Sequence, residues 1–349
     1  MTAHPQSAGF ETPIARQKSI NLALQGGGSH GAFTWGVLDR LLEEDQLTID
    51  GISATSAGSI NAVVVACGLA VGGRAEAKRA LKHFWRRLSA MAASSIFQPS
   101  IVDKLMGNFG LDYSAGYLLT NILCQVLSPY QFNPLNLNPL KHLLEETVDF
   151  QRIRQQTAVK LFLCATNVQT CKVEIFRGPE LTADHVLASS CLPFLMHAVE
   201  IGSERYWDGG FIANPALFPL IYECEARDII LVHVTPSRRP GFPVTANSIL
   251  SRMQEVSLNS SLMREMRAVA FVNKWIDQGK MTGGKQILVH LIDAEDVISG
   301  IPNSSKLNGD WDFLMYLHDV GRRRAADWLV SNFDRLGVES SIDLQTNYL

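Results

Sequence analysis

The sequence predicts a three-layer α/β/α fold with a central, mostly parallel sheet. Two observations support this class. A buried strand at residues 20–24 breaks into glycines and is followed by a helix at residues 32–44, and the same order recurs with a strand at 49–54 and a helix at 60–67. Strand and helix that alternate in this way indicate parallel strands with helices on both faces of the sheet.

Composition favours one large domain with insertions. The chain has 349 residues, of which 46% are hydrophobic and 19% charged, so it holds ample apolar material for a core. We expect a flexible N-terminal segment at residues 1–18 and a single domain at 19–349. Within that domain we expect a helical insertion at about 91–150 and a C-terminal extension of helices and a strand from about 244.

Charge and cysteine usage narrow the possible partners and location. A formal net charge of −3 gives no electrostatic case for nucleic acid or for strong attraction to anionic lipid. The six cysteines form no CxxC pair and read as reduced thiols. The first 17 residues lack the apolar core of a signal peptide, and no apolar run reaches 18 residues, so a cytoplasmic location is expected, with peripheral lipid contact left open. Oligomeric state is not indicated.

The segment at residues 114–140 contains no charged residue, and residues 117–127 have the apolar periodicity of a helix. A preceding helix is predicted at 74–88. The uncharged helix has two interpretations: it packs in the core, as apolar helical stripes usually do, or it forms a lid or acyl-chain channel over an active site.

The remaining elements complete the alternation. They are predicted as a helix at 140–148, a hairpin of strands 159–166 and 173–176, a helix at 181–190, a hairpin of 198–201 and 205–207, a strand at 229–234, a long helix at 246–277, a strand at 287–292 and a closing helix at 311–333.

Ser56 lies at the second junction between strand and helix, within Ala54-Thr55-Ser56-Ala57-Gly58. A serine in this context has the setting of a nucleophile elbow, a sharp turn that needs small neighbours two positions away. Gly58 meets that need, and Ala54 stands where a glycine is usual. The alternative is that Ser56 is a simple N-cap of the helix.

The glycine run Gly26–Gly28, extended by Gly31, leads from the first strand into the first helix. Glycines let backbone N–H groups approach the oxyanion that forms when a serine attacks an ester, and the helix N-terminus adds positive potential. The spacing also fits a dinucleotide-binding fingerprint with Asp50 as its acid, which would suggest an oxidoreductase. That acid belongs at the end of the second strand, whereas Asp50 is at its start.

Asp208 is followed by Gly209 and Gly210 after a short predicted strand. An Asp-Gly turn is the simple explanation. A carboxylate within hydrogen-bond reach of Ser56 could instead act as its base.

In combination and order, these motifs resemble those of the patatin-like phospholipases, a family of lipid acyl hydrolases. Also similar are Ala188-Ser189-Ser190-Cys191-Leu192-Pro193 and the run from Gly209 to Pro215. The resemblance covers roughly residues 19–234.

The resemblance implies a patatin-like fold with the elbow after an early strand. It implies Ser56 as nucleophile, Asp208 as proton acceptor, and the backbone of Gly26, Gly27 and Gly28 as oxyanion hole. His30, Gly31, Gly58, Gly209 and Gly210 are expected to support this site. Neither a metal nor an organic cofactor is implied, and the expected substrate is a lipid or other acyl ester.

The chain departs from the family pattern at Ala54 and at His30, where the loop often carries Arg or Lys. Because an unperturbed histidine titrates near pH 6.5, His30 is expected to make the charge of the loop depend on pH. The departures also leave open a lipid-binding or regulatory protein without catalysis.

Four other histidines lie near or within the predicted strands and motifs. His233 and His290 lie in apolar strands and are expected to be core residues with polar partners. His185 and His197 flank the Ala-Ser-Ser-Cys-Leu-Pro segment, so a Ser-His-Asp triad is a second possibility for the base.

Overall fold

A computed structural model describes residues 17–107, 109–156, 158–239 and 241–348. Eight strands form one sheet in the order β5-β6-β3-β2-β1-β7-β8, with β4 paired to β3. The parallel strands are β1 (Lys18–Leu24), β2 (Leu47–Thr55), β3 (Lys160–Asn167), β7 (Asp228–His233) and β8 (Leu288–Asp293). The antiparallel strands are β4 (Val173–Arg177), β5 (Val199–Ile201) and β6 (Glu204–Asp208).

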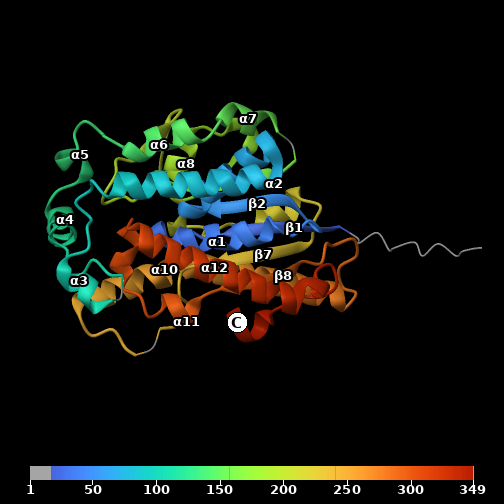
Figure 1. Cartoon of the computed structure of the whole chain (residues 1–349). Helices are drawn as coiled ribbons and strands as arrows, with labels where there is room; N and C mark the ends of the chain where they lie inside the picture. The colour runs from blue at the N-terminus through green and yellow to red at the C-terminus, as the bar shows by residue number, and fades with distance from the viewer. Residues whose placement is uncertain (1–16, 108, 157, 240, 349) are drawn as a thin grey trace, which may run out of the picture.

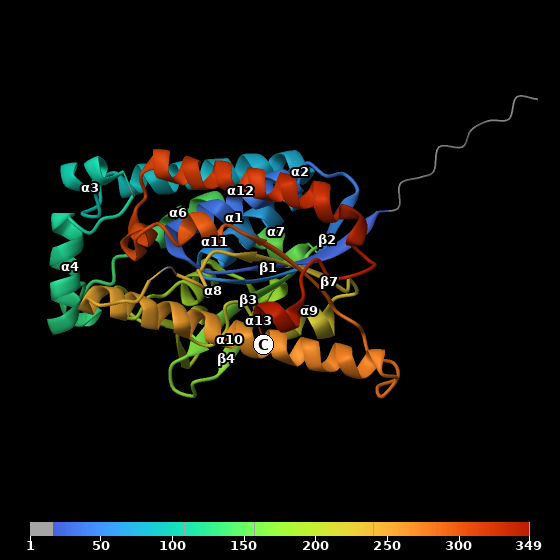
Figure 2. The ribbon, with the colours of Figure 1, turned by 90° about the horizontal axis from the view of Figure 1, so that it is seen from below.

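Helices cover both faces of the sheet, so the predicted three-layer, mostly parallel fold is confirmed (Figures 1 and 2). One face carries α1 (Gly31–Leu41), α2 (Ala57–Ala92) and α12 (Trp311–Asn332), and the other carries α9 (Phe218–Glu223), α10 (Ala246–Asp277) and α13 (Leu344–Tyr348). Side chains of β1 alternate between these layers: Leu22 and Leu24 join the first core and Ala23 joins the second.

Helix α2 includes both of the helices that were predicted separately at residues 60–67 and 74–88, and it has a break between them. Gly72 and Gly73 have non-helical backbone angles, and Gly73 has a φ of 71° that favours glycine. Within the described residues, α2 alone is long and apolar enough to cross a membrane, but 67% of its most apolar window is buried inside the protein. It therefore has the character of a core helix.

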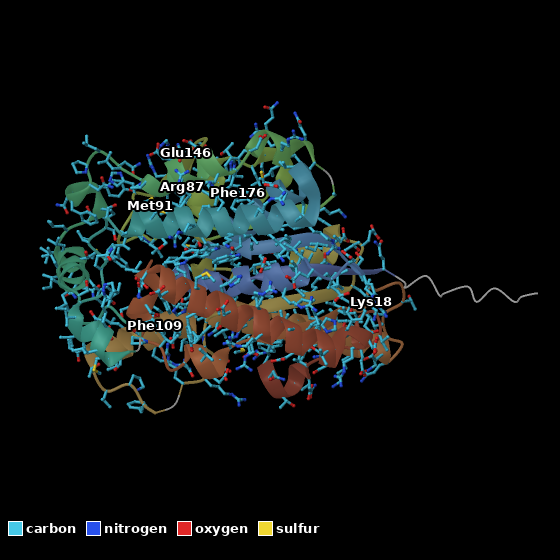
Figure 3. The ribbon with its side chains drawn as sticks, in the orientation of Figure 1. Lys18, Arg87, Met91, Phe109, Glu146 and Phe176 are labelled. Atoms are coloured by element: carbon cyan, nitrogen blue, oxygen red, sulfur yellow. The ribbon has the colours of Figure 1, made fainter. Side chains whose placement is uncertain are left out.

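Short helices make up the rest of the fold. They are η1 (Gly28–His30), α3 (Ile101–Met106), α4 (Ala115–Val126), α5 (Pro129–Phe132), α6 (Pro139–Thr147), α7 (Phe150–Gln155), η2 (Gly178–Glu180), α8 (Ala183–Ser189), η3 (Gly209–Phe211), α11 (Glu295–Ile298), η4 (Asn303–Leu307) and η5 (Phe333–Arg335). An ion pair between Arg87 and Glu146 joins α2 to α6 (Figure 3).

Helices α3, α4 and α5 form the end of the molecule opposite the start of β1, as the positions of Lys18 and Phe109 show (Figures 1 and 3). Strand β1 runs from Lys18 toward that end, and its parallel partners run the same way. The carboxyl ends of the parallel strands, where ligands bind in open α/β sheets, therefore face α3–α5.

Helix α4 has no buried residue. The interpretation of residues 117–127 as a core-packing helix is therefore wrong. The periodicity of an amphipathic helix is present, but Leu118, Leu119, Ile122 and Val126 are exposed instead of packed in the core.

The predicted division of the chain at residues 18, 91, 150 and 244 stays a prediction. The first segment lies, up to residue 16, outside the described residues, and β1 begins at Lys18.

Candidate active site

Ser56 occupies a sharp turn between β2 and α2. Its φ of 56° and ψ of −125° lie in a region that non-glycine residues rarely adopt. A Cβ at Gly58 would lie 2.4 Å from the carbonyl oxygen of Leu24, so this position requires glycine. Ala54 is still in β2, paired with Leu24 and Leu163, and has no positive φ. Alanine therefore fits here without strain, and the turn has the geometry of a nucleophile elbow.

Strand register brings Asp208 next to this turn. On β3, Cys164 pairs with Thr55 of β2, and the next residue, Ala165, pairs with Asp208 of β6. Strand β4 pairs with the opposite edge of β3 at these residues. Strand β6 therefore lies on the same edge of β3 as β2, just beyond the point where β2 ends. Residues separated by some 150 positions thus become neighbours.

Asp208 is 5% exposed, its carboxylate accepts a hydrogen bond from the Gly210 N–H (2.8 Å), and the Ser56 hydroxyl lies close enough to act on its charge. Burial raises the pKa of Asp208 to about 6, although the Gly210 N–H, the Ser56 hydroxyl and the nearby Lys306 ammonium oppose the rise. The next residue, Gly209, packs so closely that a Cβ there would lie 2.2 Å from the Cys164 carbonyl oxygen. The carboxyl group is therefore fixed beside the serine and has the basicity of a group that titrates near neutral pH.

The Ala-Ser-Ser-Cys-Leu-Pro segment connects the two residues. The Ser56 N–H donates to the carbonyl oxygen (3.1 Å) and to Oγ (3.0 Å) of Ser189. The Asp208 N–H donates to the Cys191 carbonyl oxygen (2.8 Å). Sequence reasoning identified this segment but not these roles, because the bonds involve backbone groups that leave no pattern in the sequence.

The glycine loop lies directly against Ser56. A Cβ at Gly26 would lie 2.6 Å from the Ser56 Cβ. The Gly26 N–H donates to Asn214 Oδ1 at 2.7 Å, so this group is already engaged. The N–H groups of Gly27 and Gly28 have no hydrogen-bond partner in the described part of the chain. Of the three N–H groups expected in the oxyanion hole, those of Gly27 and Gly28 are therefore not engaged by the described residues. The N–H group of Gly26 instead holds the loop in place.

His30 does not carry a pH-dependent charge near neutrality, and that expectation is corrected. The imidazole is 1% exposed, its Nε2 lies 2.7 Å from Ser305 Oγ, and burial lowers its pKa to about 3. Because the Ser305 hydroxyl donates to the Pro302 carbonyl oxygen, His30 Nε2 is the donor in their hydrogen bond. His30 is therefore neutral and structural, and it holds η4 against the loop.

The other candidate residues lie elsewhere. The Asp50 carboxylate accepts the Glu225 and Ala226 N–H groups, far from the end of β2. His185 lies 2.8 Å from the Thr182 hydroxyl, and His197 Nε2 lies 3.1 Å from the Pro129 carbonyl oxygen. No hydrogen bond joins either histidine to Ser56 or Asp208 among the described residues.

Two histidines in strands have polar partners, as expected for core residues. His290 contacts Asp228 (3.0 Å) and His233 contacts Asn259 (3.2 Å). Within the described ranges, no group of three or more His, Cys, Asp or Glu side chains is placed to hold a metal ion.

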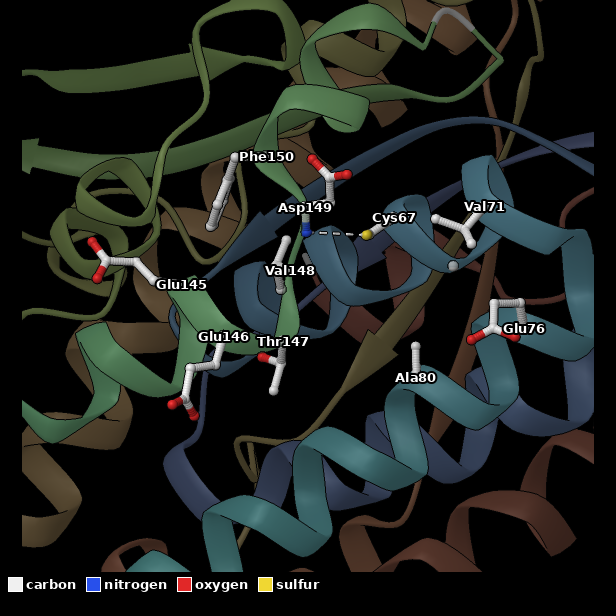
Figure 4. A pocket seen from close by; sticks show the side chains of 11 residues that line it. Cys67, Val71, Glu76, Ala80, Glu145, Glu146, Thr147, Val148, Asp149 and Phe150 are labelled. Carbon is white, nitrogen blue, oxygen red and sulfur yellow. Dashed lines mark hydrogen bonds between the residues drawn. The ribbon is translucent and has the colours of Figure 1, made fainter.

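A cavity of about 590 Å³ lies between α2 and the segment at residues 145–150 (Figure 4). Cys67 and Asp149 line it, and the Asp149 N–H donates to the Cys67 sulfur at 3.3 Å. Neither Ser56 nor Asp208 lines this cavity, so it is separate from the candidate site.

The three-layer fold, with a serine at a strained turn beside a buried carboxylate, is the arrangement expected of an α/β ester hydrolase. A sequence model described as patatin-like phospholipase matches residues 22–221, which contain both Ser56 and Asp208. The match spans more than half of the chain, and the protein belongs to the patatin-like phospholipase family.

Solved structures are similar to this chain at low identity. VipD from Legionella pneumophila aligns at a TM-score of 0.35 and 16% identity, over 88% of this chain and 67% of VipD. A structure of full-length ExoU with full-length SpcU, from the type III secretion system of Pseudomonas aeruginosa, aligns at 0.35 and 15%, over 92% of this chain and 53% of that one. The chain thus spans about half the length of the second structure. No curated protein sequence matches it.

Proposed function

We propose that this protein hydrolyses carboxylic esters of lipids with a Ser56-Asp208 dyad. Family membership supports lipid acyl hydrolysis as the general activity. The observation that carries the proposal is Ser56, held at a strained turn that the strand register places beside a buried carboxylate whose pKa is about 6.

In the proposed mechanism, Ser56 Oγ attacks the ester carbonyl carbon while Asp208 accepts the hydroxyl proton. The Gly27 and Gly28 N–H groups hold the resulting oxyanion. Asp208 then returns the proton to the leaving alcohol, and an acyl-enzyme remains. Water, deprotonated by Asp208, releases the fatty acid and regenerates Ser56.

We also propose that the lipid reaches the site from the end that carries α3–α5. Apolar side chains there are exposed, among them Ile101, Leu105, Ile122 and Val126. Cys124 of α4 donates through its thiol to the Phe194 carbonyl oxygen (3.1 Å), just beyond the segment that connects Ser56 and Asp208. The apolar surface is therefore joined to the surroundings of the dyad, as a lid or a site of peripheral membrane contact would be.

The dyad is tested by ester hydrolysis and by labelling with a fluorophosphonate probe. Ser56→Ala should abolish labelling and lower kcat by about 10³-fold or more, and Asp208→Ala should lower it by about 10²–10⁴-fold. Ser331→Ala, on the exposed surface of α12, is the matched control and should match wild type.

Three outcomes would contradict the proposal in different ways. If Ser56→Ala keeps wild-type activity, Ser56 is not the nucleophile. If only Asp208→Ala keeps activity, another group is the base. If wild type neither reacts with the probe nor hydrolyses esters, the chain is a lipid-binding protein without catalysis.

The oxidoreductase alternative is weakened, because the Asp50 carboxylate accepts hydrogen bonds from the backbone N–H groups of Glu225 and Ala226.

A further inference from the structure

Helix η4 lies directly against the glycine loop, although 278 positions separate Gly28 from Lys306. A Cβ at Gly28 would lie 2.4 Å from the Lys306 carbonyl oxygen and 3.3 Å from the Lys306 Cβ. The hydrogen bond between His30 and Ser305 fixes the same two segments together. Lys306 is thereby seated on the loop that is proposed to hold the oxyanion.

The positive charge of Lys306 is not neutralised by a direct partner. Within the described ranges, no hydrogen bond or ion pair joins its ammonium group to another residue. The nearby Glu255 is fully buried and already pairs with Arg239 (2.7 Å) and Arg252 (3.1 Å). Lys306, Arg239 and Arg252 carry three positive charges, and Glu255 carries one negative charge. A surplus of positive charge therefore lies behind the glycine loop.

Lys306 faces groups from several elements. They are Asp208 at the end of β6, His30 of η1, Glu255 of α10, and Arg239 in the segment before α10. His30 is neutral, so the loop itself supplies no side-chain cation.

Asp208 has its own set of neighbours. They are Lys306, the Ser56 hydroxyl, the Gly210 N–H and the Cys191 thiol. The pKa of Cys191 is raised to about 12 by burial and by Asp208, so this thiol is neutral. Among the described residues, Lys306 is therefore the cation that acts on Asp208.

We propose that Lys306, from outside the segment matched by the family, supplies the positive charge of the catalytic site. It keeps Asp208 in the carboxylate form that accepts the proton, and it adds positive potential where the oxyanion forms. Lys306 acts through Asp208 and the loop, as a positioning residue. The inference rests on the proposed Ser56-Asp208 mechanism.

This arrangement sets two limits on the active pH range. Below about pH 6, Asp208 is protonated and cannot accept the Ser56 proton. Burial lowers the pKa of Lys306 to about 8, so above that pH the ammonium group loses its charge. We expect kcat/KM to be highest between these two values.

The test is the pH profile of kcat/KM on a water-soluble nitrophenyl ester, which does not depend on lipid binding. Lys306→Arg should keep the acidic limb near pH 6 and move the basic limb beyond pH 10, because arginine stays charged. Lys306→Met should move the acidic limb upward, remove the basic limb and lower kcat/KM at pH 7 about tenfold or more.

Lys285→Met is the matched control. Lys285 is also half-buried with a lowered pKa, but it donates to the Cys224 carbonyl oxygen near the start of β2, and its loss should leave the profile unchanged. A Lys306→Met profile identical to wild type would overturn the inference. If Lys306→Met does not fold, a basic limb that stays near pH 8 in Lys306→Arg overturns it instead.

Ser56→Ala measured in parallel separates the two proposals. If Ser56→Ala is active, the mechanism itself fails. If Ser56→Ala is inactive and both Lys306 profiles match wild type, the mechanism stands and only the role of Lys306 fails.

Discussion

At the scale of single residues, Asp208 illustrates how burial acts on function and stability in opposite directions. Burial raises its pKa to about 6 and so gives a carboxylate the basicity that proton transfer near neutral pH requires. The same burial disfavours the charged form, so the folded protein is destabilised wherever Asp208 is ionised. The Gly210 N–H, the Ser56 hydroxyl and Lys306 reduce this penalty without removing it.

We predict that Asp208→Asn stabilises the fold at neutral pH. A folded pKa of about 6 against an ordinary value of 3.8 corresponds to a penalty of about 3 kcal/mol. Because the folded pKa is raised, the penalty is fully present above pH 6 and disappears as pH falls toward 3.8. Asparagine keeps the acceptor for Gly210, so the gain in unfolding free energy over wild type should shrink between pH 6 and pH 4. Denaturant unfolding at pH 4, 6 and 8 measures it, and a gain that does not change with pH would contradict the raised pKa.

The sequence predicted Ser56, Asp208 and the glycine loop because each lies at a strand end in a motif of small residues. It did not predict Lys306, which follows two serines in an ordinary polar segment. It also misjudged His30, because burial under η4 and not residue type decides its charge. Contacts between segments so far apart in the chain leave no local pattern.

At the scale of elements, α4 shows what periodicity reveals and what it leaves undetermined. The spacing of apolar residues from 117 to 127 correctly predicted a helix, as the long helix from 246 to 277 was also predicted. A helix that packs on a protein core and a helix that contacts lipid have the same spacing of apolar residues. The surface that α4 faces could therefore not be known from the sequence.

We predict that the apolar surface of α4 contributes to lipid binding. The double variant Ile122→Ser and Val126→Ser changes side chains that are 62% and 76% exposed, so stability should change little. Each side chain that enters lipid contributes about 1–2 kcal/mol, and binding to phosphatidylcholine vesicles should weaken by about tenfold or more. Since residues 114–140 carry no charge, salt should have little effect on this binding.

Vesicle sedimentation with and without added salt measures that binding. Val330→Ser, in the last turn of α12 and 89% exposed, is the control and should bind as wild type does. Equal binding by the double variant and wild type would exclude α4 as a lipid-contacting element. Hydrolysis of a soluble ester should be unchanged in all three proteins.

At the scale of the whole molecule, the part of the chain beyond the family match packs against the candidate site. Helix η4 contacts the glycine loop on one side and the base of α3–α5 on the other, where Ser304 Oγ accepts the Leu111 N–H (2.9 Å) and Asn308 donates to the Phe109 carbonyl oxygen (2.9 Å). Phe109 stacks on Phe313 at 4.9 Å. The end of the molecule that carries α3–α5 and the glycine loop therefore share one support, η4, which α12 follows in the chain.

The last prediction concerns the packing of α12 on α1, which holds that support in place. A Cβ at Gly321 would lie 2.1 Å from the Phe33 carbonyl oxygen, and a Cβ at Gly36 would lie 1.9 Å from that of His318. Gly321→Ala must therefore separate the two helices, which should cost about 1–3 kcal/mol and lower Tm by several degrees. Because η4 leads directly into α12, the same shift should move Lys306 from Gly28 and lower kcat/KM on the soluble ester. Gly300→Ala is the control, since its Cβ would meet only the Val297 carbonyl oxygen at 3.5 Å. A loss of stability without any loss of kcat/KM in the folded Gly321→Ala protein would show that α12 supports the fold but not the site.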